Sequence, residues 1–133
     1  MMKKNIFLTF IMSLYLCCDP SSSALYQIKN ETNYNGVVLF YAQNNETSFE
    51  INSNSTVTIS KVGGFGVTDI DLNITDDSVI FLFEYDSKII KFYKDSINEN
   101  GKSIYNESSW EKTKISNHNY KFMFTISDND LND

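Results

Sequence analysis

Residues 78–85 read SVIFLFEY and residues 88–93 read KIIKFY, with only Asp86 and Ser87 between them. Both runs are rich in β-branched and aromatic residues, which favour strands over helices. Two such runs separated by two residues are typical of a β-hairpin. A two-residue turn would set the following cross-strand pairs: Tyr85 with Lys88, Phe83 with Ile90, and Phe81 with Phe92.

Apolar and polar residues also alternate through most of the chain between Leu25 and Ile126. A period of two is the pattern of a strand with one buried face, whereas a helix repeats every 3.6 residues. Besides the hairpin, the pattern predicts strands over 25–30, 37–43, 48–51, 57–59, 67–75, 110–115 and 120–126. We therefore predict an all-β fold, an antiparallel β-sandwich or small barrel of seven to nine short strands.

The segments between the predicted strands are rich in turn-forming residues. Residues 63–66 read GGFG and are expected to form a loop, as is the long polar segment 94–109. Residues 127–133 form an acidic tail that we expect to fray. By contrast, the segment 37–43 is apolar at nearly every position, which predicts a central strand covered on both faces.

The N-terminus has the pattern of an export signal. Residues 1–5 are short and basic, and residues 6–16 are apolar except for Thr9 and Ser13. An apolar run of about eleven residues is too short for a membrane span, which needs roughly twenty. We therefore expect residues 1–17 to form a signal helix that is cleaved. An ordinary secretory signal, cut near Ser23–Ala24, is the alternative.

Cys17 and Cys18 follow the apolar run directly, where a lipoprotein carries its acylated cysteine. Cys18 has the small Cys17 before it and is the preferred acylation site, with Cys17 as the alternative. More than one acyl chain, such as palmitate, is needed for a stable membrane anchor. Residues 18–24 would then be the lipidated cysteine and a flexible tether, and residues 25–133 a single β-sandwich domain with the acidic tail.

Three stretches of the chain resemble the small lipoproteins of Bacteroidetes-type bacteria. They are the signal that ends in Cys17–Cys18, the hairpin from Val79 to Ile90, and the closing segments 109–111 and 120–128. Together they cover less than half of the chain. The resemblance implies a β-rich domain tethered to the outer membrane, on its periplasmic or surface face, and it implies no catalytic residues.

The charge of the chain argues against nucleic acid as a partner. All eleven basic residues are lysines, against 17 Asp and Glu, and the net charge at pH 7 is −6. Nucleic-acid binding depends on basic patches, which this balance disfavours. Both cysteines lie at the signal, so the domain has no disulfide framework, thiol nucleophile or cysteine-ligated metal site.

No motif in the domain identifies catalysis or a cofactor, and we expect no cofactor. Asp69 and Asp71 open a D-x-D-x-N run of the calcium-loop type, but Ile74 and Ile80 stand where such a loop needs Gly and Glu. The two aspartates are therefore weak metal candidates, and the solvated face of a strand is the preferred interpretation. The only histidine, His118, lies in a predicted turn.

Aromatic residues in predicted loops remain as candidate contacts: Trp110, Tyr105, Tyr34 and Phe65. Such side chains can anchor a protein interface or stack on sugars, although Trp110 could instead close the open end of the core. The sequence thus favours a non-enzymatic, membrane-anchored module that binds an envelope or extracellular protein. Glycan binding through the loop aromatics is one alternative, and a carboxylate-based hydrolase is a less favoured one.

Overall fold

The computed structural model describes residues 21–43, 45–65, 70–72, 74–84, 89–93 and 102–131, without the side chains of Phe65 and residues 91–93. The predicted signal helix, Cys17, Cys18 and Asp69 lie outside these residues. So do the predicted turn at Asp86–Ser87 and the first half of the loop 94–109, residues 94–101.

The described residues form eight strands and two short 3-10 helices, η1 (Glu107–Ser109) and η2 (Asp128–Leu131). The strands are β1 (Ser21–Asn30), β2 (Gly36–Ala42), β3 (Asn45–Ile51), β4 (Ser55–Phe65), β5 (Ser78–Phe83), β6 (Ile89–Tyr93), β7 (Trp110–Ser116) and β8 (Asn119–Ile126). Sheet A has the order β4-β1-β8-β7 and sheet B the order β3-β2-β5-β6. The prediction of an all-β, two-sheet fold is confirmed, as is the central position of β2.

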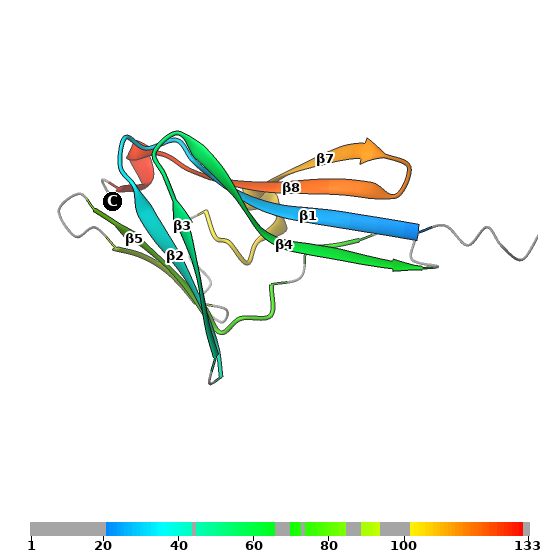
Figure 1. Ribbon diagram of the computed structural model, residues 1–133, viewed down its shortest axis with the longest axis horizontal. Helices are drawn as coiled ribbons and strands as arrows, with labels where there is room; N and C mark the ends of the chain where they lie inside the picture. The colour runs from blue at the N-terminus through cyan, green and yellow to red at the C-terminus, as the bar shows by residue number, and fades with distance from the viewer. Residues whose placement is uncertain are drawn as a thin grey trace, which may run out of the picture.

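The two sheets form the layers of an open sandwich. They lie close together near the β1–β2 and β3–β4 turns and diverge from there, so that the layers form a wedge (Figure 1). Most neighbouring strands are antiparallel, but β1 and β8 run parallel, from the pair Ser23–Asn119 to the pair Asn30–Ile126. The described strands thus form the predicted, predominantly antiparallel sandwich with one parallel pair, which joins the first described strand to the last.

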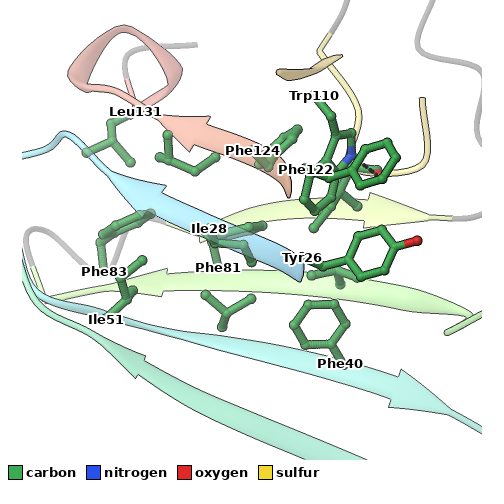
Figure 2. Packing of buried hydrophobic residues seen from close by; sticks show 14 of the residues in the cluster. Tyr26, Ile28, Phe40, Ile51, Phe81, Phe83, Trp110, Phe122, Phe124 and Leu131 are labelled. Atoms are coloured by element: carbon green, nitrogen blue, oxygen red, sulfur yellow. Dashed lines mark hydrogen bonds between the residues drawn. The ribbon is translucent and has the colours of Figure 1, made fainter. Parts of the chain in front are cut away.

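The core consists of the inward-facing residues of both sheets (Figure 2). Alternate residues of β1 and β8 face inward, and Ile28, Phe122 and Phe124 are fully buried. Phe124 meets Phe81 of sheet B with ring centroids 6.2 Å apart. Burying one such side chain stabilises the fold by roughly 1.5–3 kcal/mol. The alternating pattern in the sequence therefore identified these inward faces correctly.

The hairpin formed by β5 and β6 has a different register from the predicted one. Phe81 pairs with Ile90 and Val79 with Phe92, a shift of two residues from the expected pairs. An Asp-Ser pair lacks the glycine that fixes a two-residue turn, so the turn does not impose the predicted register. Because the shift is even, each residue keeps the face that the sequence predicted.

β1 begins four residues before the predicted Leu25. Residues 21–24, expected in the tether, pair with residues 62–65 of β4, and Ser23 and Ala24 also pair with β8. The expectation of a loop at residues 63–65 is wrong for the same reason. Gly63 pairs with Ser23, and a Cβ atom there would lie 3.3 Å from the Ser22 carbonyl oxygen, so glycine fits this close approach to β1.

The segment 67–75 was predicted as a strand, but its described residues, 70–72, 74 and 75, pair with no strand. Ile70, Leu72 and Ile74 nevertheless pack against the core. Their alternation therefore reflects burial of one side of an extended chain rather than a ladder. The acidic tail also differs from its prediction, because η2 places Leu131 in the core at 5% exposure.

Candidate functional site

A cleft opens between β3 and β4, which are edge strands of different sheets. The two strands are joined by a tight turn at residues 52–54, where Asn54 has a φ of 53°, and they separate beyond it. The cleft has a volume of about 210 Å³ and is lined by Tyr26, Phe40, Thr47, Phe49, Ile59, Ser60, Ile74, Thr75 and Asp76. Its lining thus combines aromatic and aliphatic side chains with hydroxyl groups and one carboxylate.

Buried aromatic rings form the floor of the cleft. Tyr26 of β1 and Phe40 of β2 face each other across the two sheets (Figure 2) and are 3% and 6% exposed. The Tyr26 ring stacks on Phe122 at 5.2 Å and meets Trp110 edge-on at 6.2 Å. Aromatic neighbours on two sides fix the ring, so the floor is preorganised rather than formed on binding.

The walls of the cleft come from the two edge strands. On β3, Phe49 is held by an edge-on contact with Phe40, with ring centroids 5.8 Å apart. On β4, the register against β1 shifts between Tyr26 and Gln27, which leaves Ile59 as an extra residue beside Ser60. Such a β-bulge redirects side chains, and here it places both Ile59 and Ser60 on the cleft wall.

Residues 74–76 contribute to the lining of the cleft, and residues 70–72 precede them in the chain. This segment is held by two tyrosines, because Tyr26 Oη donates to the Asp71 carbonyl at 3.0 Å and Tyr105 Oη to the Asp76 carbonyl at 3.1 Å. Burial, together with the nearby Asp76 and Asp77 carboxylates, raises the pKa of Tyr105 to about 12. The Tyr105 hydroxyl therefore stays protonated at neutral pH and remains a donor to this segment.

The structure places three of the four predicted contact residues, Trp110, Tyr105 and Tyr34, in or against the core. Trp110 is 6% exposed, and its Nε1 donates to the Ile104 carbonyl at 2.8 Å. Tyr105 and Tyr34 are half-buried and pack against the core. Phe65 ends β4, and its side chain is not among those described. This placement gives no particular support to the glycan alternative.

Neither Asp71, a metal candidate of the sequence, nor His118 lines the cleft. Asp71 is exposed, and its carboxylate lies 3.9 Å from the ammonium of Lys112. Among the described residues, no group of three or more His, Cys, Asp or Glu side chains could hold a metal ion. His118 lies in the β7–β8 turn with a φ of 60°, away from the cleft-lining residues.

Two carboxylates do share a second hollow, of about 390 Å³, on sheet B. Glu50 and Glu84 line it together with residues around Gly36. Both glutamates are exposed, and Glu84 Oε2 accepts a hydrogen bond from Asn35 Nδ2 at 3.2 Å. A pair open to solvent lacks the desolvation that lets one of two carboxylates act as an acid at neutral pH. The hollow therefore does not favour the hydrolase alternative.

Comparison with known proteins identifies no relative. No family model matches the chain, and no curated protein or solved structure does so either. Within the described part of the chain, no helix has the length and apolar character of a membrane span. The cleft and the sequence are therefore the features that bear on function.

Proposed function

We propose that this protein is a lipid-anchored envelope protein that binds another envelope or extracellular protein, with the β3–β4 cleft as its binding site. The observation that carries the proposal is a cleft with a rigid aromatic floor and a mixed apolar and polar lining, located where two sheet edges separate. The cleft would receive an apolar side chain of the partner, as hot-spot pockets in interfaces do.

The size of the cleft favours a protein side chain over a free small molecule. Sites for drug-sized ligands have volumes of about 300–1,000 Å³, and this cleft has about 210 Å³. Its walls are strands with one hydrogen-bonded neighbour each, so their outer backbone groups face outward. An extended segment of a partner could pair with β3 or β4 while one of its side chains enters the cleft.

The anchor is supported by the sequence. The apolar run ends at Cys17–Cys18, and β1 begins at Ser21. A lipidated Cys18 would hold the domain close to the membrane, within reach of other envelope proteins. Mass spectrometry of the protein from the membrane fraction tests the anchor. We expect a mature chain that begins at Cys18 with attached acyl chains, and an unmodified chain that begins downstream would contradict the proposal.

A pair of matched substitutions tests the cleft. Thr47 and Thr56 are exposed threonines on neighbouring edge strands, but only Thr47 lines the cleft. We expect Thr47→Trp to fill the cleft and to weaken partner binding at least tenfold, whereas Thr56→Trp leaves binding unchanged. The measurement is affinity capture from envelope extracts, followed by titration of the purified partner by calorimetry. Equal binding by both variants and the unsubstituted protein would exclude the cleft as the interface.

A further inference from the structure

The far end of sheet A carries a local excess of positive charge. This sheet A tip comprises residues 21–24 of β1, 61–65 of β4 and 114–121 of β7, β8 and the turn between them. Figure 1 shows these ends side by side at the wide end of the wedge. The tip segments contain Lys61, Lys114, Lys121 and His118 and no Asp or Glu, in a chain of net charge −6.

The strand registers determine how these lysines are arranged. Leu25 of β1 lies opposite Lys61 on one side and opposite Lys121 on the other, so both lysines share the outer face of sheet A. Lys114 lies opposite Tyr120, the neighbour of the buried Ala24, and is therefore on the other face, so the three lysines meet only at the end of the sheet. Lys61 and Lys114 are exposed. The tip also carries two exposed large apolar side chains, Val62 at 46% and Ile115 at 56%. Exposed apolar side chains among lysines are typical of a surface that enters a lipid headgroup region.

The chain itself limits how far this tip could lie from a lipid on Cys18. Only Asp19 and Pro20 separate Cys18 from Ser21, the first residue of β1. Three residue steps span at most about 11 Å even when fully extended. Attraction between lysines and anionic headgroups acts over a similar range, because the screening length at physiological salt is about 8 Å. A lipid on Cys18 would therefore hold the tip lysines within reach of the headgroups.

We infer that the sheet A tip docks on the anionic phosphates of the bilayer that carries the anchor. Lys61, Lys114 and Lys121 contact the phosphates, while Val62 and Ile115 enter the interface. This inference rests on the proposed lipid anchor and adds an orientation to it. The β2–β3 turn lies away from the tip (Figure 1), so it would stand clear of the membrane.

The orientation is measured on the acylated full chain in vesicles of phosphatidylcholine and phosphatidylglycerol. A fluorescent label is attached at Asn117→Cys in the tip or at Asn45→Cys at the start of β3, both exposed asparagines. The vesicles carry a quencher on their headgroups. The unsubstituted protein, treated with the same label, gives the fluorescence that comes from the native Cys17 and Cys18, and this signal is subtracted. We expect quenching several-fold stronger at residue 117 than at residue 45. Equal quenching, or stronger quenching at residue 45, would overturn the inference.

Lysine variants test the phosphate contact separately. Lys61→Gln/Lys121→Gln removes two tip charges, and Lys29→Gln/Lys112→Gln removes two sheet A charges outside the tip. We expect only the tip variant to lose the excess quenching at residue 117. If the two variants behave alike, the tether positions the domain and the lysine contact is refuted.

The mass of the reconstituted chain separates failure of the anchor from failure of the tip. If the chain carries no acyl group, the anchor of the proposed function is wrong. The same chain is then sedimented with the anionic vesicles. Binding that falls about fivefold per tip lysine replaced supports the docking surface, and absence of binding refutes it.

Discussion

Asn30 is a buried polar residue that connects two turns of the sandwich. Its Nδ2 donates to the carbonyls of Tyr34 at 2.7 Å and Asn52 at 3.0 Å. Its Oδ1 accepts from both the backbone amide and the hydroxyl of Thr32. All polar atoms of this fully buried amide are therefore engaged. The β1–β2 connection is thereby joined to the turn from which β3 and β4 separate to form the cleft.

Replacing Asn30 by alanine should be costly, because it leaves the buried backbone amide and hydroxyl of Thr32 without the oxygen that accepts from both. We expect Asn30→Ala to lower the free energy of unfolding by about 3 kcal/mol, since each orphaned buried group costs about 1–3 kcal/mol. Asn33→Ala is the control, because Asn33 is exposed and its Nδ2 donates to the exposed Asp128 carboxylate at 3.3 Å. Urea denaturation measures both. Similar midpoints for the two variants would contradict this role of Asn30.

The sequence pattern predicted the burial of the apolar core residues but not that of the polar residue Asn30. Ile28 and Phe124 stand at alternate positions of amphipathic strands, so their burial could be predicted from period alone. Asn30 continues the same inward face, but an asparagine followed by turn-forming residues is typical of an exposed strand end. Its burial depends on the Asn52 carbonyl, 22 residues away, which no local pattern indicates.

At the scale of elements, η2 shows how the acidic tail is held. Asp130 accepts hydrogen bonds from the amide and hydroxyl of Ser127 and from the ammonium of Lys102, at 2.7, 2.8 and 2.8 Å. Burial alone would raise the pKa of Asp130, but Lys102 and Ser127 together outweigh it and lower the pKa below its ordinary value. These contacts place Leu131 in the core and hold the tail against the loop that contains Lys102.

The lowered pKa of Asp130 makes the docking of η2 sensitive to acid. Its stabilisation is complete above the unfolded-state pKa of about 4 and is lost as pH falls through the lower folded-state pKa. We expect Asp130→Asn to cost about 1–2 kcal/mol of unfolding free energy at pH 6. The difference from the unsubstituted protein should shrink progressively as the pH falls below about 4. Urea denaturation across this range measures it, and a difference that is constant with pH would refute the ion pair.

The cleft is the element-scale feature that the sequence did not reveal. The sequence showed strands on both sides of residues 52–54, a pattern equally compatible with a hairpin. In the structure the strands pair with different neighbours, β3 with β2 and β4 with β1. A hairpin and a connection between two sheets have the same local sequence pattern. They differ only in which strands, distant in the sequence, pair with the two connected strands. The cleft between them therefore becomes visible only when the sheet order is known.

At the scale of the whole molecule, the parallel pair of β1 and β8 completes sheet A. β1 has β4 on one side and β8 on the other, and β8 in turn holds β7. The pairing of β1 with β8 joins residues about 95 positions apart, as in Ser23 with Asn119. Sheet A therefore cannot form until the end of the chain is present. Such distant contacts are associated with slow folding.

The dependence of the whole fold on β8 can be tested by truncation. Phe122, Phe124 and Ile126 are fully or almost fully buried, and each contributes roughly 1.5–3 kcal/mol. Their sum is comparable with the total stability of a typical domain, about 5–15 kcal/mol. We expect a chain that ends at His118 to show no cooperative unfolding in urea, whereas a chain that ends at Leu131 keeps the transition of the full chain. Circular dichroism measures both transitions. If the chain that ends at His118 unfolded cooperatively at the midpoint of the full chain, β1 would not need its parallel partner, and sheet A would not depend on its last strand.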